Sequence, residues 1–273
     1  MNDMPVLLEP IRLLTELMWA LHISTTLVAM YMIRFLAAML ILPSMGGSAL
    51  NGMSQTGIAL LLAAFTAYGR SPDELANLTG GLIGMIAIKE ALLGVALGFA
   101  MSTAYWVVQN AGVLIDNAAG YNSIQLRNPQ TGWQSTPVSD LLLNLAVAVF
   151  FSLGGAVYFA EAIFESYRVW PLVDLLPSAQ NAYLSFIEQQ VGDLFGNTLK
   201  LAAPVIIVVA LIDVGFGLLA RSAEKLEPAS LSQPVKGVVC IVMVSLFISV
   251  AFSELRQHLL PRGLVQQIAP KPR

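Results

Sequence analysis

The residues with the clearest chemical potential are two aspartates that recur in the same short pattern. Leu-Ile-Asp116 is followed four residues later by Gly120, and Leu-Ile-Asp213 is followed four residues later by Gly217. Two carboxylates in membrane-associated helices would share a proton if they met, as in an aspartyl protease dyad. Intramembrane aspartyl proteases place a Gly-x-Gly before the second aspartate, whereas Gly215 and Gly217 follow Asp213 here. Two separately hydrogen-bonded buried carboxylates are therefore the favoured interpretation.

Other groups that commonly do chemistry are sparse. The only histidines, His22 and His258, lie near opposite ends of the chain, and the one cysteine, Cys240, lies in an apolar run. A single cysteine permits no internal disulfide and no multi-cysteine metal site. No glycine-rich loop ends in Lys-Ser or Lys-Thr, so ATP hydrolysis by this chain is not expected. We predict no enzyme activity, no cofactor and no metal site.

The composition is typical of a membrane protein. Apolar residues make up 56% of the 273 residues and charged residues only 11%, against about 25% charged in soluble domains. That much apolar surface needs lipid or a large protein partner around it. The formal net charge is −3 and there is no basic stripe, which argues against nucleic acid as a partner.

Six apolar segments predict an all-α, polytopic membrane protein, since a membrane span needs about 20 apolar residues. The second segment is short for a span. The fourth carries no charge between Asp140 and Glu161 and is expected to be the cleanest span. The segments are Leu17–Leu42, Gly57–Tyr68, Gly80–Val108, Leu141–Ala160, Leu199–Ala220 and Val235–Phe252.

Charged residues inside these segments are candidates for buried polar contacts. Arg34, Lys89, Glu90 and Asp213 lie in apolar runs, where each charge costs about 2.5–3.5 kcal/mol at the bilayer centre on insertion scales. Either these side chains are buried against protein, or they lie near helix ends and extend to the surface. Positive charges flank the last segment on both sides, so the positive-inside rule leaves the membrane orientation open.

Small residues and one proline predict local features of the helices. Pro204 is expected to interrupt the fifth segment because proline frees a backbone carbonyl. Tyr167 and Trp170 are predicted as anchors at the membrane interface. Close helix contact is predicted at Gly80-x3-Gly84 and at Gly94-x3-Gly98-x3-Ser102.

The polar stretch Gln109–Asp140 joins the third and fourth segments. It is rich in asparagine and glutamine, and only three charged residues lie between Asn110 and Leu141. Neutral amides form hydrogen bonds without long-range attraction for either sign of charge, so such a lining would let an extended polypeptide pass. Glycines and prolines, among them Gly112 and Gly120, predict bends rather than a continuous helix. An ordinary surface loop is the alternative interpretation.

Several motifs follow one another in register between Arg34 and Phe252. They include Lys89-Glu-Ala-Leu-Leu-Gly-Val-Ala-Leu-Gly98, Gln109-Asn-Ala-Gly-Val-Leu-Ile-Asp-Asn-Ala-Ala-Gly120, Asn128-Pro-Gln-Thr-Gly132, Ser166-Tyr-Arg-Val-Trp-Pro171 and Leu231-Ser-Gln-Pro-Val-Lys236. Together they resemble the FliR/SctT family (YscT, SpaR, HrcT), the T subunit of the type III secretion export apparatus. Motifs in order over this length are more specific than any single motif.

The resemblance implies a multi-pass subunit of the bacterial inner membrane, within a secretion basal body. It implies assembly with other small export-apparatus membrane proteins into a helical gate, through which unfolded polypeptides pass toward the inner rod and needle components. We expect one membrane domain over residues 1–253, with a plug-like loop at 109–140 and a helical hairpin at 199–253. A short basic tail is expected at 254–273, and a virulence- or symbiosis-type system is preferred over a flagellar one.

The resemblance also implies roles for particular residues. The plug-like loop is implied to close the channel at rest, and its mapped residues are Asp116, Gly120, Tyr121, Asn128, Pro129, Gly132 and Pro137. The candidates for assembly or buried polar contacts are Arg34, Lys89, Glu90, Asp213, Arg221 and Lys236. The alternative function is a small-solute secondary transporter with Lys89, Glu90 and Asp213 as a relay. The repeated Leu-Ile-Asp pattern, however, is too short to indicate the inverted repeat that such transporters often have.

Overall fold

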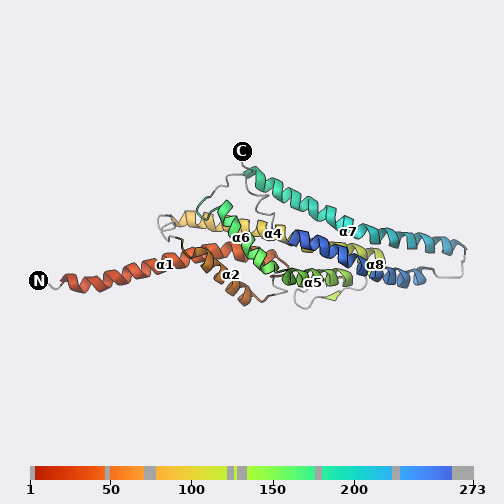
Figure 1. The fold of residues 1–273 in the computed structure, drawn as a ribbon, viewed down its shortest axis with the longest axis horizontal. Coiled ribbons are helices and arrows are strands. Elements are labelled where there is room, and N and C mark those ends of the chain that lie inside the picture. The colour runs from red at the N-terminus through yellow and green to blue at the C-terminus, as the bar shows by residue number, and fades with distance from the viewer. Residues whose placement is uncertain are drawn as a thin grey trace. The chain divides into compact units, whose positions relative to one another are not determined.

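The described part of the chain is almost entirely helical. The computed structural model describes residues 4–46, 50–70, 78–121, 126–127, 134–175, 180–222 and 228–259. Its helices are α1 (Met4–Ile41), α2 (Gly52–Ala67), α4 (Gly80–Ala119), α5 (Pro137–Ser152), α6 (Gly155–Val169), α7 (Gln180–Ser222) and α8 (Pro228–Leu259) (Figure 1). The strands β1 (Leu126–Arg127) and β2 (Gln134–Ser135) form one short antiparallel pair. The all-α prediction is confirmed.

Several helices are long and apolar enough to cross a membrane. Three candidate spans are Leu13–Ile41 in α1, Gly80–Ala119 in α4 and Ile187–Arg221 in α7. The bent pair α5 and α6 makes a fourth candidate if both helices form one span. Helix α2 and the part of α8 from Leu231 to Leu246 are apolar but shorter. These lengths agree with the predicted polytopic membrane protein.

Contacts divide the chain into two compact units, which we describe separately. The first contains the described residues of Met1–Phe99 and Ala160–Gln180, and the second those of Ala100–Phe159 and Asn181–Gln267. Helices α4 and α6 therefore contribute to both units. The single membrane domain over residues 1–253 stays a prediction.

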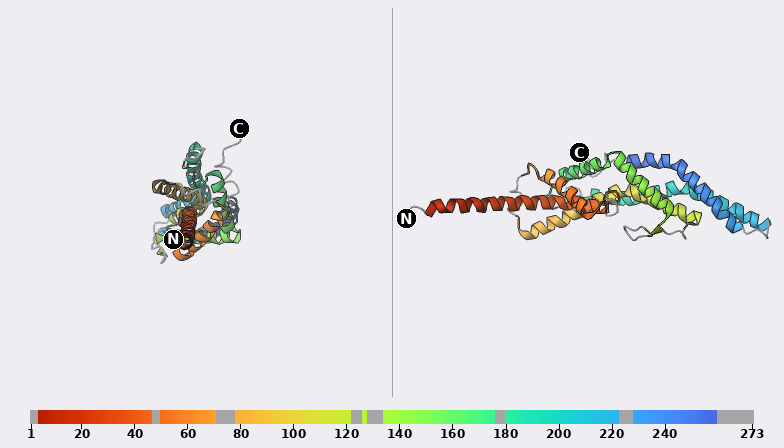
Figure 2. Two further views of the ribbon diagram at one scale, coloured as in Figure 1. Left: turned by 90° about the vertical axis from the view of Figure 1, so that its left-hand side faces the viewer. Right: turned by 90° about the horizontal axis from the view of Figure 1, so that it is seen from below.

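In the first unit, α1 is one uninterrupted helix whose N-terminal half extends beyond α2 (Figure 2). That half carries exposed apolar side chains, among them Met18 and Trp19. Its C-terminal half is buried and packs on α6 through aromatic contacts. The rings of Tyr31 and Tyr167 meet edge to face at 4.8 Å between centroids. Lipid or another protein must therefore cover the first half, whereas the second half belongs to the core.

Helices α1 and α4 approach each other closely at two glycines. A Cβ atom on Gly94 would lie 2.7 Å from the Ala37 Cβ, and one on Gly98 would lie 2.6 Å from the Ala38 carbonyl oxygen. The predicted small-residue contact is confirmed at this pair. At Gly80 and Gly84 a Cβ atom would have no described atom within 4 Å, so the close contact predicted there is not present among the described residues.

These glycines provide a test of the packing. We expect Gly94→Ala to lower the free energy of unfolding by about 1–3 kcal/mol, because Ala37 and the Arg34 backbone would have to move. The control Gly84→Ala should be neutral or stabilising, by up to about 1 kcal/mol, since alanine favours helices. Thermal unfolding of the purified chain in detergent measures both. Equal melting temperatures of the two variants would contradict the close contact.

The fourth predicted segment, Leu141–Ala160, is not one straight span. Helix α5 ends at Ser152, and α6 leaves it at an angle of 74°. Gly154 lies between them with φ +76, a left-handed conformation that favours glycine. Gly155 packs directly on the Phe150 ring, where a Cβ would collide. Absence of charge correctly predicted an apolar segment, but the turn depends on these two glycines.

Two stretches that lie between the predicted apolar segments are largely helical. Helix α4 continues through Gln109 and Gly112 to Ala119, so the loop begins at Gly120 rather than at Gln109. Helix α7 begins at Gln180 and continues through Pro204, which was wrongly expected to interrupt it. In apolar surroundings the backbone groups have few partners outside the helix, which favours continuation.

The C-terminal hairpin is therefore longer than the predicted range 199–253. Its arms are α7 and α8, which run in opposite directions (Figure 1). Helix α8 continues to Leu259, so the first residues of the predicted tail at 254–273 are helical. The rest of that tail lies outside the described residues.

Candidate functional site

The most strongly buried charges lie in the first unit. Arg34 of α1 and Glu90 of α4 are both 0% exposed. The Arg34 Nε lies 2.7 Å from Glu90 Oε2, and Arg34 Nη2 lies 2.8 Å from Glu90 Oε1. Such a two-point pair fixes the relative orientation of both groups as well as neutralising them. The sequence left the pairing of these charges open, and the structure assigns them to each other.

The remaining donors of Arg34 bind the end of α6. Its Nη1 donates to the Ser166 hydroxyl at 2.9 Å, and its Nη2 donates to the Trp170 carbonyl at 3.2 Å. The Tyr167 ring lies 3.7 Å from the guanidinium carbon, in cation–π contact. Tyr167 is buried and its hydroxyl donates to the Tyr31 carbonyl at 3.0 Å. The prediction of Tyr167 as an interface anchor is therefore wrong, because the arginine and the core occupy its ring.

Lys89 holds the segment that follows α6. Its ammonium lies 2.9 Å from Glu90 Oε1. It also donates to the carbonyls of Pro171, Leu172 and Asp174 at 2.9, 2.6 and 3.1 Å. An ammonium group has three N–H donors, and these carbonyl oxygens give Lys89 acceptors that the Glu90 carboxylate could not supply alone. Lys89 therefore fastens residues 171–174 to α4.

We call Arg34, Lys89 and Glu90 the buried charge cluster. It joins α1, α4 and the end of α6, and every one of its three side chains is less than a tenth exposed. A buried ion pair loses much hydration, which its hydrogen bonds and attraction must offset. The dense hydrogen bonding favours a structural clamp over the proton relay of the alternative transporter hypothesis.

The second unit holds one end of the predicted plug-like loop. Asp116 of α4 is 0% exposed, and its Oδ2 accepts hydrogen bonds from the backbone N–H of Val138 at 2.9 Å and Ser139 at 3.2 Å. Thr136 stands at the N-cap of α5 but makes no side-chain capping bond, and Pro137 begins the helix. Asp116 thus caps α5 from a different helix, and its negative charge suits a helix N-terminus.

Close packing supports this cap. A Cβ on Gly112 would lie 2.5 Å from the Ser139 Cα and 2.7 Å from the Ser139 nitrogen. Glycine at this position therefore lets α5 start directly against α4, within reach of Asp116. Gly112 serves helix contact rather than the bend that its residue type suggested.

Helix α8 holds the other end of the loop. Gly120 has φ +82 and ends α4, and its carbonyl accepts a hydrogen bond from Gln233 Nε2 at 3.0 Å. The Tyr121 hydroxyl lies against Gly237, at a place where a Cβ would collide with it. We call these contacts, together with the Asp116 cap, the loop base. The predicted loop residues Asn128, Pro129 and Gly132 lie outside the described residues.

The remaining predicted residues lie on the hairpin. Asp213 of α7 forms an ion pair with Lys236 of α8, with Asp213 half exposed. Arg221 is exposed in the last turn of α7. Asp116 and Asp213 have different partners and share no hydrogen bond in the described chain. This agrees with two separately bound carboxylates rather than a catalytic dyad.

Sequence reasoning did not single out several residues of these sites. Ser166 binds the cluster, and Gln233 and Gly237 hold the loop. A signal was present, because Ser166 and Gln233 lie inside two of the motifs on which the resemblance rested. Gly237 directly follows the second of these motifs.

Comparison with known proteins decides the family. The profile of the family described as bacterial export proteins, family 1, matches residues 25–260. The chain belongs to this family. It is 27% identical to the Yop proteins translocation protein T of Yersinia pestis, over 78% of this chain and 82% of that protein. It is 28% identical to the surface presentation of antigens protein SpaR of Salmonella typhimurium, over 76% and 77%. It is 26% identical to the flagellar biosynthetic protein FliR of Bacillus subtilis, over 82% and 86%.

The predicted resemblance is confirmed. As a bacterial export protein of family 1 with several apolar spans, the chain is a multi-pass inner-membrane component of an export apparatus and not an enzyme. The buried charge cluster and the loop base are thus features of an export protein. Both lie within the matched residues.

Proposed function

We propose that this export protein is the T subunit of a type III secretion export gate, and that the loop between α4 and α5 helps to seal its channel. The relatives are named for Yop protein translocation, surface presentation of antigens and flagellar biosynthesis. The translocation, antigen-presentation and flagellar relatives match at similar identity, so the preference for a virulence-type system stays a prediction.

The loop base is the observation that carries the sealing role. Contacts hold both ends of the loop: buried Asp116 binds the start of α5, and the exposed Gln233 side chain binds the carbonyl of Gly120. Anchored ends limit the space that the intervening residues can sample, because loop entropy depends on how its ends are held. A loop that closes a channel must return to one place after each opening, and a fixed base supports this.

The composition of the loop supports the same role. Between Gly120 and Pro137 it contains Arg127 as its only charged residue, together with several amide side chains. Amides bind neither positive nor negative polypeptide segments strongly at long range. Such a loop would touch a passing chain without retaining it.

The proposed partners follow from the exposed surface. Large apolar side chains are exposed on α1, α2, α7 and α8, among them Trp19, Phe65, Phe195 and Leu246. A soluble monomer exposes less apolar surface than this. The excess therefore indicates contact with lipid or with another protein. We propose other export-apparatus membrane subunits as the neighbours, unfolded secreted polypeptides as cargo, and inner rod or needle components beyond the channel.

Shortening the loop tests its sealing role. Replacing residues 126–135 by a short glycine-serine linker should make the inner membrane permeable to small ions and solutes while the complex still assembles. The measurement pairs conductance or dye entry with affinity purification of the tagged complex. A matched control replaces residues 223–227, the α7–α8 connection, by the same kind of linker and should leave permeability unchanged. Unaltered conductance in an assembled loop variant would refute the sealing role.

A further inference from the structure

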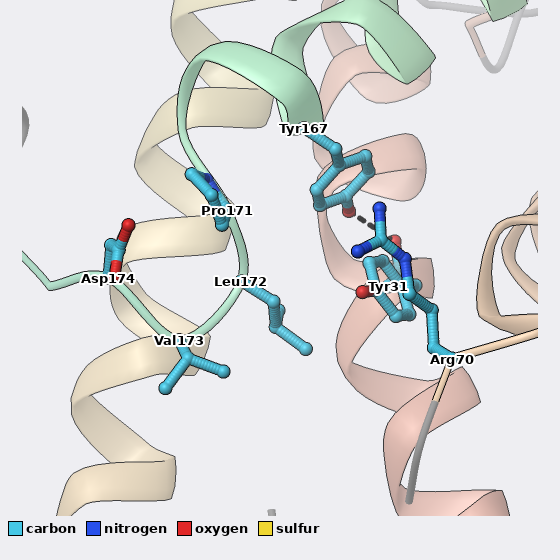
Figure 3. Close-up of a pocket in the computed structure, with 7 residues that line it drawn as sticks. All are labelled: Tyr31, Arg70, Tyr167, Pro171, Leu172, Val173 and Asp174. Carbon is cyan, nitrogen blue, oxygen red and sulfur yellow. Dashed lines mark hydrogen bonds between the residues drawn. The ribbon is translucent and has the colours of Figure 1, made fainter. Parts of the chain in front are cut away.

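A pocket in the first unit lies beside the buried charge cluster but is separate from its ion pair. It has a volume of about 410 Å³ and is lined by Tyr31, Arg70, Tyr167 and the four residues Pro171 to Asp174. Figure 3 shows Arg70 and Asp174 on opposite sides of it, with the two tyrosines next to Arg70. This volume falls within the range of small-ligand sites, which is about 300–1,000 Å³.

The walls of the pocket are held in place by contacts already described. Lys89 binds the carbonyls of Pro171, Leu172 and Asp174, and the Trp170 Nε1 donates to the Asp174 carbonyl at 2.6 Å. On the other side, the Tyr167 hydroxyl donates to the Tyr31 carbonyl (Figure 3). A wall that is ordered before binding lowers the entropy lost when a ligand enters.

The charged side chains that line the pocket are one of each sign. Arg70 and Asp174 are both exposed. Within the described chain, neither side chain forms an ion pair. An anion alone would lie close to the Asp174 carboxylate, and a cation alone would lie close to the Arg70 guanidinium. A molecule that carries a phosphate and a primary ammonium satisfies both, since guanidinium binds phosphate at two points.

The surface next to Arg70 points to a lipid as the source of that zwitterion. Leu61, Phe65 and Tyr68 are 72%, 71% and 89% exposed, and their spacing places them on one face at the end of α2. Helix α2 carries no charged residue. An acyl chain along this face would cover exposed rings directly before Arg70, and tyrosine and arginine are favoured at the membrane interface.

We propose that this pocket binds the headgroup of a zwitterionic aminophospholipid, with Arg70 binding the phosphate and Asp174 the primary ammonium. The site is independent of channel sealing and rests only on the membrane location of the chain. Phosphatidylcholine carries a methylated ammonium that cannot donate hydrogen bonds, and phosphatidylglycerol carries no cation. Both should bind more weakly than phosphatidylethanolamine.

Native mass spectrometry of the full chain, purified in mild detergent with its co-purifying subunits, tests this. Samples receive equal amounts of phosphatidylethanolamine, phosphatidylcholine or phosphatidylglycerol, and retained lipid is counted. Phosphatidylethanolamine should be retained best. Arg70→Gln should weaken its retention about tenfold, which corresponds to about 1.4 kcal/mol, because the two-point contact of the guanidinium with the phosphate is lost. Asp174→Asn should weaken it by a few-fold, as expected for an exposed pair.

Arg168→Gln is the matched control. Arg168 is exposed and pairs with Glu165 in the same unit, but it does not line the pocket. It should leave lipid retention unchanged, and the melting temperatures of all three variants should match the parent. Equal retention of the three lipids, or preference for phosphatidylglycerol, would overturn the proposal. Displacement of the lipid by free phosphoethanolamine at millimolar concentration would overturn the lipid source and leave a soluble zwitterion as the ligand.

Discussion

Replacing Glu90 by glutamine should lower the free energy of unfolding by about 3–5 kcal/mol, as expected when one partner of a buried ion pair is lost. Glu90 is the only carboxylate among the three side chains of the buried charge cluster. The glutamine would leave Arg34 and Lys89 as two buried cations without a counterion. Few single substitutions outside such clusters reach this size.

The two cations should be less sensitive than the carboxylate. Arg34→Met leaves the Lys89–Glu90 pair intact, and Lys89→Met leaves the Arg34–Glu90 pair intact. In each case one cation and one carboxylate remain, so no net charge is buried. Both variants still lose hydrogen bonds to the end of α6, and we expect each to be destabilised by less than Glu90→Gln.

Thermal unfolding of the purified complex, with the yield of assembled complex as a second readout, measures this order. Glu165→Gln is the control, since Glu165 pairs with Arg168 on the surface, where such pairs contribute about 0–1 kcal/mol. The double variant Arg34→Met/Glu90→Gln should be no less stable than Glu90→Gln alone, because it removes one of the uncompensated cations. If Glu90→Gln melted like the Glu165 control, the clamp role would be wrong.

Replacing Asp116 by alanine should make the assembled gate leak. Two backbone N–H groups at the start of α5 would lose their acceptor, and Ser139 is buried. Loss of such contacts costs about 1–3 kcal/mol. If the anchoring of the loop is weakened by the same free energy, the fraction of gates with a detached loop base rises roughly 5- to 150-fold.

Asp116→Asn separates hydrogen bonding from charge. Only Oδ2 of Asp116 accepts hydrogen bonds from described residues, and an amide oxygen can take its place. The asparagine variant should therefore remain close to the parent in permeability. Asn117→Ala, at the exposed neighbouring position, is the control for local helix effects. A tight membrane with Asp116→Ala in a fully assembled complex would show that the cap does not hold the seal.

Much of the architecture was predictable from local patterns. Long apolar runs predicted the helices because backbone groups in lipid have to be satisfied within the segment. The spacing of Gly94 and Gly98 correctly predicted a close helix contact. The boundaries were less predictable. Glutamine, asparagine and glycine at 109–119 suggested a loop, but α4 continues there because α5 packs against Gly112.

The charged members of the candidate site were predictable, but their pairing was not. Arg34, Lys89, Glu90 and Asp213 were recognisable as charges that an apolar helix would avoid. Their partners lie far away in sequence: Arg34 binds Glu90, Ser166 and Trp170, and Lys89 binds the backbone after α6. Every residue has a backbone carbonyl, so the residue types do not indicate which carbonyls accept hydrogen bonds. The acceptors of Lys89 could therefore not be predicted from the sequence.

Composition, apolar run length and ordered motifs are properties of the amino-acid sequence, and they were sufficient to identify a helical inner-membrane export protein. The fold was needed to show which charges neutralise each other, that Asp116 caps α5, and that α8 holds the start of the loop. These contacts join residues far apart in the sequence, 113 positions for Gln233 and Gly120 and 136 for Arg34 and Trp170. Burial strengthens the charge pairs of the cluster and the Asp116 cap, since a charge or an N–H group removed from water must find its partner within the fold.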